Sequence, residues 1–326
     1  MAAEAQMVAI QGAPARRRPS GTAGDTIFRG LTAGFAVLVL VILGGVIVSL
    51  VYGAWPALRK FGIGFIVNSA WNPVTENFGA LAPIYGTLVT SLIAMLIGIP
   101  VAFGVALFIT ELCPKWLKRP LGTMIELLAA IPSIIYGIWG LFVLVPFIQQ
   151  YIQPALIDTL GEIPGLGILF AGPPLGIGVL TAGFILAIMV LPFIASVMRD
   201  VFETVPPMLK ESAYGIGATT TEVVTRVVLP YTRVGVVGGI LLGLGRALGE
   251  TMAVTFVIGN SHHVNPSILQ PGTTISAALA NEFTEAVGDI YQSSLIALGL
   301  ILFIITFLVL AAAKLMLLRL QKAAGG

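Results

Sequence analysis

Residues 83–110 read PIYGTLVTSLIAMLIGIPVAFGVALFIT, without one Asp, Glu, Lys or Arg. About 20 consecutive apolar residues are enough for a helix to cross the hydrocarbon core of a bilayer. Inside lipid, every backbone N–H and C=O needs a hydrogen-bond partner within the protein, and a helix supplies one to nearly all of them. We therefore predict a transmembrane helix here, and this assignment decides the class of the fold.

The composition of the whole chain is that of a membrane protein. Of its 326 residues, 57% are hydrophobic and only 10% are charged, and the mean hydropathy is +1.00. A soluble domain carries about 25% charged residues, so a soluble globular enzyme is excluded, and the high hydrophobicity excludes intrinsic disorder. The formal net charge of +2 indicates no nucleic-acid partner.

Six apolar stretches are long enough to span a bilayer, and none alternates as a membrane β-strand would. We predict an all-α polytopic membrane protein with six transmembrane helices. Residues 1–27 are rich in Ala, Gly, Pro and Arg, and we expect a disordered tail there. The six predicted helices cover residues 28–52, 83–110, 121–148, 175–198, 234–258 and 291–318.

The distribution of Lys and Arg predicts the orientation in the membrane, because these residues accumulate in cytoplasmic segments. With the N-terminus in the cytoplasm, fourteen of the 17 Lys and Arg residues lie on the cytoplasmic side. Arg59 and Lys60 then lie outside, and Arg246 lies within a predicted helix. Both termini, and with them the tail, are therefore predicted to be cytoplasmic.

The long connection at residues 199–233 reads RDVFETVPPMLKESAYGIGATTTEVVTRVVLPYTR. We predict a short helix over 208–214 and a break at the glycines. A second helix, capped by one of the threonines at 219–221, is predicted to stop at Pro230. Two short helices would form a compact projection from the membrane. An ordinary amphipathic connector lying on the membrane is the alternative.

The order of residues in this connection resembles the cytoplasmic loop signature of ABC-importer permeases. That pattern is Glu-Ala-Ala, three residues, Gly, nine residues and Ile-x-Leu-Pro, and it departs here only at Ser212 and Val227. The resemblance implies a type I ABC-importer permease fold and a loop that docks on an ATP-hydrolysing subunit. The coupling residues that it implies are Glu211, Ser212, Ala213, Gly217, Leu229 and Pro230.

Two charges, Arg246 and Glu250, lie in the fifth apolar stretch. A charge at mid-bilayer costs about 2.5–3.5 kcal/mol on insertion scales, so such residues face a bundle interior or a water-filled cavity. Their i,i+4 spacing predicts that the side chains meet on one helix face. They could form a structural ion pair, or an anion site in which the Arg fork holds phosphate oxygens. The same face carries three small residues, Gly235, Gly239 and Gly243.

Three segments closely resemble the phosphate-specific transport (Pst) permeases of the PstC type: residues 130–140, 186–212 and 243–254. The resemblance extends over residues 83–318, where it implies a five-helix permease core, with a family-like first helix at 28–52. It implies inward transport of inorganic phosphate, with Arg246 and Glu250 in the substrate pathway. Permeases for another oxyanion (molybdate, sulfate or phosphonate), a gradient-driven anion carrier or channel, and a membrane anchor without transport remain the alternatives.

The same resemblance implies the partners. They are a second permease subunit (PstA-like), a dimer of ATPase subunits (PstB-like) and an extracytoplasmic phosphate-binding protein (PstS-like), in the lipid bilayer. This chain contains no GxxxxGK[ST] sequence, so ATP and Mg are expected on the partner ATPase. No cofactor, metal site or catalytic residue is expected on this chain.

Overall fold

A computed structural model describes residues 23–324. Contacts divide the chain into two units, residues 1–49 and residues 50–326, and each is described by itself. The tail predicted for residues 1–27 falls mostly outside the described residues. From Ala23 onward, where that segment is described, it is helical.

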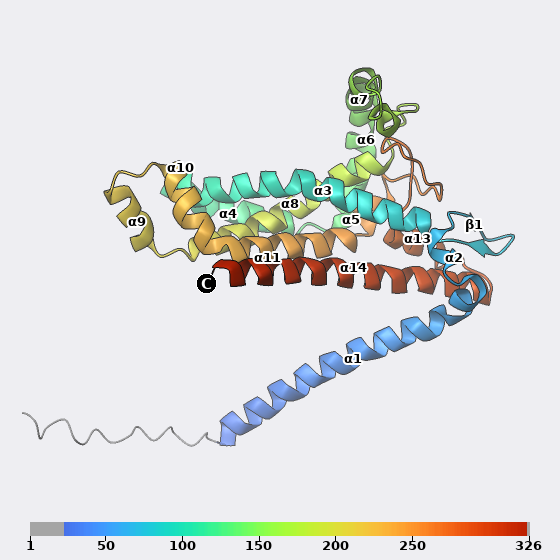
Figure 1. Ribbon diagram of the computed structural model, residues 1–326, viewed down its shortest axis with the longest axis horizontal. Coiled ribbons are helices and arrows are strands. Elements are labelled where there is room, and N and C mark those ends of the chain that lie inside the picture. Colours follow the sequence, from blue (N-terminus) through green and yellow to red (C-terminus); the bar gives the residue numbers. More distant parts are fainter. Residues whose placement is uncertain (1–22, 325–326) are drawn as a thin grey trace, which may run out of the picture. The chain divides into compact units, whose positions relative to one another are not determined.

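Helices make up most of the described chain (Figure 1). Strands β1 (Trp71–Asn72) and β2 (Asn77–Phe78) form a short antiparallel ribbon in which Trp71 pairs with Phe78. The α-helices are α1 (Ala23–Phe61), α2 (Gly64–Val67), α3 (Leu81–Leu107), α4 (Lys115–Ala129), α5 (Ser133–Trp139), α6 (Val145–Phe147), α7 (Gln153–Leu160), α8 (Val179–Glu203), α9 (Pro207–Gly215), α10 (Thr220–Val223), α11 (Leu229–Leu248), α12 (Met252–Thr255), α13 (Ile275–Glu282) and α14 (Asp289–Ala324).

Six helical segments of the described chain are long and apolar enough to cross a membrane, which confirms the predicted number of transmembrane helices. The first, Gly24–Phe61, is longer than the predicted 28–52. Three others follow their predicted boundaries closely: Leu81–Leu112, Val179–Glu203 and Asp289–Arg319.

The third predicted helix, residues 121–148, is wrong in its boundaries. Helix α4 ends at Ala129 and α5 begins at Ser133, so the predicted helix is broken at Pro132. Proline has no N–H to donate, and it disfavours a helical conformation at the preceding residue. From α5 to α7 the chain runs steeply across the direction of α3 and α8 (Figure 1). The spanning segment here is Ser133–Leu160.

The fifth predicted helix, residues 234–258, is also wrong at both ends. Helix α10 continues through a π turn at Val224–Val228 into α11, so Thr220–Leu248 is one apolar segment. Pro230 does not stop it, because Pro230 lies at the start of α11, directly after this wider turn. A local π turn is one way in which a membrane helix tolerates proline.

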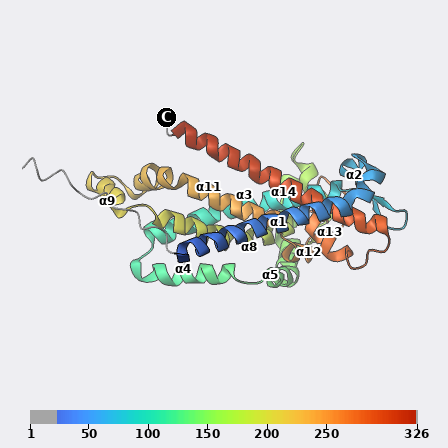
Figure 2. The same ribbon diagram turned by 90° about the horizontal axis from the view of Figure 1, so that it is seen from below.

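Helix α8 is the central helix of residues 50–326, and most of its length is buried. Helices α3, α4 and α11 pack against it (Figure 2). The three glycines of α11 form a seam that lies so close to α8 that a side chain on any of them would crowd α8. A Cβ would lie 2.5 Å from Val201 at Gly235, 3.0 Å from Val197 at Gly239 and 2.5 Å from Ile194 at Gly243.

This glycine seam generates a stability prediction. Gly243→Leu should lower the free energy of unfolding of the detergent-purified protein by about 1–3 kcal/mol, because the side chain overpacks the contact with α8. Gly238→Leu is the matched control, since a Cβ at Gly238 meets nothing within 4 Å. Thermal unfolding midpoints measure both. Equal midpoints for the two variants would contradict the close packing of α11 on α8 at Gly243.

Candidate functional site

Arg246 lies in the last turn of α11, at the end of the glycine seam, and its side chain is exposed. Its guanidinium carbon is 5.9 Å from the ring centroid of Phe193 on α8. On α5, the Tyr136 hydroxyl donates a hydrogen bond to the Leu128 carbonyl at 3.0 Å. Among the described residues, no carboxylate oxygen lies within 4.0 Å of a guanidinium nitrogen of Arg246, so Arg246 forms no ion pair there.

Glu250 does not share a helix face with Arg246, so the predicted i,i+4 ion pair is wrong. Helix α11 ends at Leu248, and residues 249–251 form a break before α12. Glu250 Oε1 instead accepts a hydrogen bond from the Ala253 backbone N–H at 3.2 Å. The sequence pattern missed this break because the apolar run continues across it.

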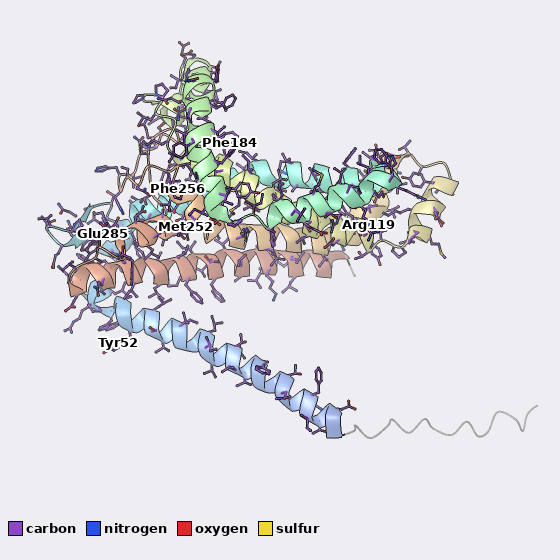
Figure 3. All side chains as sticks on the ribbon, turned by 180° about the vertical axis from the view of Figure 1, so that it is seen from behind. Tyr52, Arg119, Phe184, Met252, Phe256 and Glu285 are labelled. Atoms are coloured by element: carbon purple, nitrogen blue, oxygen red, sulfur yellow. The ribbon has the colours of Figure 1, made fainter. Side chains whose placement is uncertain are left out.

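Helix α5 packs on α12 and on Phe256, which follows α12 directly. A Cβ at Gly137 would lie 2.8 Å from the Phe256 ring and 3.0 Å from the Met252 carbonyl oxygen. Figure 3 shows Met252 and Phe256 beside this helix. Arg246, which precedes the break, is exposed, and its five N–H donors are free of any carboxylate in the described chain. Such a group can bind an oxyanion.

The first predicted helix of the 199–233 loop is confirmed as α9 (Pro207–Gly215), which carries Glu211, Ser212 and Ala213. Gly217 ends it in the left-handed conformation, with φ of +92°. The Ala218 N–H donates to the Ala213 carbonyl at 3.1 Å, and the Gly217 N–H donates to Tyr214 at 2.9 Å. This is the hydrogen-bond pattern of a Schellman motif, which favours glycine at this position.

The start of the second helix is also confirmed. Thr219 caps α10, and its backbone N–H donates to Glu222 Oε2 at 2.9 Å in a reciprocal capping box. A hollow of about 340 Å³ lies between α9 and α10, and Ala213, Gly217 and Glu222 line it.

The structure does not bring all six implied coupling residues together at this hollow. Glu211 and Ser212 are exposed on α9. Leu229 and Pro230 lie at the start of α11, inside one continuous helical segment.

Sequence reasoning missed a polar cluster at the other end of the helices. Glu282 accepts hydrogen bonds from Trp71 Nε1 at 2.6 Å and from the Tyr291 hydroxyl at 2.7 Å, and it contacts His262 Nε2 at 2.6 Å. The His262 ring stacks on Trp71 with centroids 4.8 Å apart. Burial alone would raise the pKa of the Glu282 carboxyl, but hydrogen bonds from His262 and Tyr291 outweigh it and hold that pKa below its ordinary value.

A second contact that the sequence did not predict joins Lys210 of α9 to Glu111, at 2.6 Å. The two residues are 99 positions apart, and no local spacing signals such a pair.

The family described as "Binding-protein-dependent transport system inner membrane component" matches residues 98–322. The "Phosphate transport system permease protein PstC" of Mesorhizobium japonicum is 64% identical over 301 residues, which cover 92% of each chain. The PstC of Haemophilus influenzae is 56% identical, over 92% of this chain and 95% of the relative. A "Probable phosphate transport system permease protein PstC" of Methanocaldococcus jannaschii is 39% identical, over 86% of this chain and 88% of the relative.

Solved structures of ABC transporters share the fold at low sequence identity. A bacterial ABC transporter for import of the acidic polysaccharide alginate matches with a TM-score of 0.58 and 17% identity, over 90% of this chain and 96% of that chain. The MetNI methionine ABC transporter, in an inward-facing conformation, matches with a TM-score of 0.54 and 17% identity, over 73% and 94%. These likenesses confirm the predicted type I ABC-importer permease fold.

Proposed function

Because the chain belongs to the PstC group of the binding-protein-dependent transport system inner membrane components, we propose that it carries inorganic phosphate inward across the cell membrane. It does so as the multi-pass permease subunit of an ATP-driven importer. The observation that carries this function is that identity to PstC proteins extends along almost the whole chain, in bacterial and archaeal relatives.

The transport assay with the complete importer in proteoliposomes tests this function. Entry of phosphate should depend on ATP and on the binding protein. Preferred uptake of sulfate, molybdate or a phosphonate would support the other-oxyanion alternative. Uptake that needs an ion gradient and no ATP would support a carrier.

Arg246 is proposed as a phosphate ligand in the pathway. Its guanidinium stays charged at any reachable pH, and its exposed side chain has no carboxylate partner in the described chain. A planar fork of N–H donors matches two phosphate oxygens. Glu250, which hydrogen-bonds the start of α12, lies four residues away in sequence. Its negative charge would weaken phosphate binding enough to permit release.

The 199–233 loop is proposed to dock on the ATPase subunits, which would hold ATP and Mg. The exposed Glu211 and Ser212, the hollow beside Gly217 and the fixed end of α9 support this role. A PstA-like permease and a PstS-like phosphate-binding protein complete the proposed assembly. ATP binding drives the cycle because ATP binds one conformation of the assembly more tightly than the other.

Both termini are proposed to be cytoplasmic. Helices α9 and α10 and the end of α14 lie at one end of residues 50–326 (Figure 1), the end that carries most of the Lys and Arg. Cysteines placed at Asn77 and Gly215 in a Cys113→Ser background test this with an impermeant thiol reagent in whole cells. The cysteine at 77 should react and that at 215 should not. The reverse labelling would contradict the orientation.

The phosphate ligand is tested by Arg246→Gln and Arg246→Lys. Loss of charge-assisted hydrogen bonds of about 1.5–3 kcal/mol should reduce uptake at least about tenfold in Arg246→Gln. Phosphate uptake by Arg246→Lys, which keeps the charge without the planar fork of N–H donors, should lie between that of Arg246→Gln and that of the wild type. Arg233→Gln, an exposed arginine on the same helix, is the control and should transport normally. Uptake by Arg246→Gln within twofold of the wild type would remove Arg246 from the pathway.

The docking role is tested at Gly217. Gly217→Ala should strain the left-handed cap of α9 by about 1–2 kcal/mol and weaken ATPase association and phosphate uptake together. Gly215→Ala is the matched control, because Gly215 has no positive φ and open space around its Cβ position. Co-purification of the ATPase and uptake are measured in parallel. Equal behaviour of the two variants would argue against the docking surface.

A further inference from the structure

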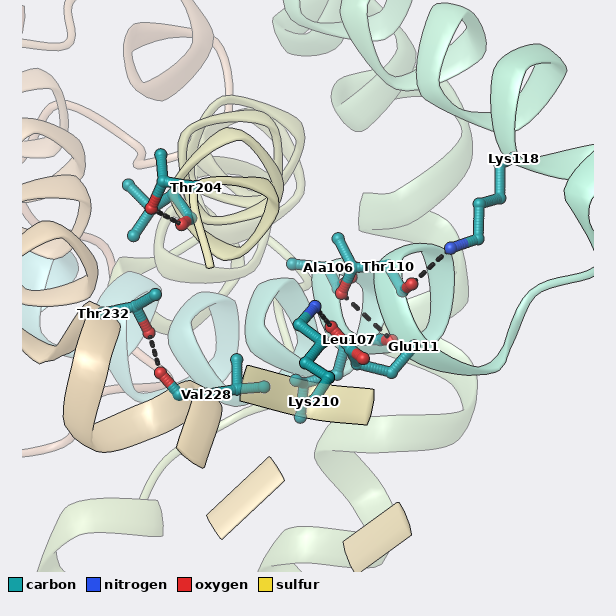
Figure 4. Close-up of polar contacts among 10 residues, drawn as sticks. Ala106, Leu107, Thr110, Glu111, Lys118, Thr204, Lys210, Val228 and Thr232 are labelled. Atoms are coloured by element: carbon teal, nitrogen blue, oxygen red, sulfur yellow. Dashed lines mark hydrogen bonds and ion pairs between the residues drawn. The ribbon is translucent and has the colours of Figure 1, made fainter. Parts of the chain in front are cut away.

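One buried ion pair connects α9 to the membrane-spanning helices. Lys210 Nζ donates to Glu111 Oε1 at 2.6 Å (Figure 4). The Glu111 side chain is only 6% exposed and that of Lys210 is 19% exposed. Within residues 23–324, this is the only hydrogen bond or ion pair that joins α9 to a residue outside 206–218.

Glu111 lies in an irregular turn of the backbone at the end of α3. The end of α3 widens into a π turn at Phe108–Leu112, and such turns inside helices frequently occur at functional positions. Helix α4 holds the same turn from another side, because Lys118 donates to the Thr110 carbonyl oxygen (Figure 4). The position of α9 is thereby tied to the end of α3 by a contact between charged groups.

Helix α3 in turn packs along α8, in the most extensive helix contact of the described chain. The contact is close: a Cβ at Gly183 of α8 would lie 2.5 Å from Ile93 of α3. Helix α8 also carries Phe193, which faces Arg246. A displacement of the end of α3 therefore acts on the helix that supports the proposed phosphate ligand.

We propose that the Lys210–Glu111 ion pair transmits the movement of α9 to α3 during transport, so that both are positioning residues for translocation. The inference rests on the proposed function. Breaking a buried ion pair leaves uncompensated charge, so the two groups stay together when one element moves. The remaining support of α9 is apolar, such as the partly buried Ala213, and apolar surfaces slide more readily.

The test uses the complete importer in proteoliposomes, with phosphate transported per ATP hydrolysed as the readout. The main variant, Glu111→Gln with Lys210→Met, removes the link without leaving a buried unpaired charge. The exchanged variant, Glu111→Lys with Lys210→Glu, restores an ion pair. Lys60→Met with Glu76→Gln is the matched control, because it removes an exposed ion pair of 3.1 Å far from α9.

The neutral pair should hydrolyse ATP and lose at least about fivefold in phosphate transported per ATP, within the range by which coupling residues act. The exchanged pair should recover to about half of the wild-type ratio or more, and the control should equal the wild type. A wild-type ratio in the neutral pair would overturn the inference. Failure of the neutral pair to assemble would also overturn it, because the contact would then be structural.

These outcomes are separate from those that test the proposed function. If the wild-type assembly transports no phosphate, the proposed function fails. If the wild type transports phosphate and the neutral pair keeps the full ratio, only the ion-pair inference fails.

Discussion

The close approach of α11 to α8 along Gly235, Gly239 and Gly243 is the contact on which the rest of the site depends. Between helices in lipid the hydrophobic effect provides little attraction, because lipid tails are as apolar as the side chains. Tight van der Waals contact and polar links must hold the helices together instead. The glycine seam brings the backbone of α11 onto α8 and fixes Arg246, the next residue along the seam, beside Phe193.

The break after Leu248 is the second determinant of the site. Irregular backbone at membrane depth is tolerated only where it is buried in protein or lines a water-filled cavity. The Glu250 side chain hydrogen-bonds the Ala253 N–H across this break, and the Glu250 N–H donates to the Ala247 carbonyl at 3.4 Å. The Glu250 carboxylate, which the sequence pattern pairs with Arg246, thus accepts a hydrogen bond from the backbone instead. Arg246 therefore has no carboxylate partner among the described residues.

The sequence predicted features that depend on local physics. Six apolar segments, a capping threonine within 219–221 and the small face of α11 all follow from spacing and residue type, and the structure contains them, with Thr219 as the cap. The sequence-based predictions failed where a tertiary contact or a helix irregularity determines the local structure. Pro230 does not end its helix because a π turn precedes it, and the apolar run hides the break at 249–251. Trp71, Glu282 and Tyr291 meet only through the fold.

The Lys210–Glu111 ion pair, which attaches α9 to the end of α3, is suited to the proposed transmission of movement between these two elements. An apolar contact between α9 and α3 would compete with lipid and with other apolar surfaces, so it would hold no preferred position. Separating a buried carboxylate such as Glu111 from its cationic partner leaves an uncompensated charge. Glu111 therefore keeps Lys210 at one place on the π turn. The same low exposure that makes the pair costly to break makes the position of α9 and the end of α3 interdependent.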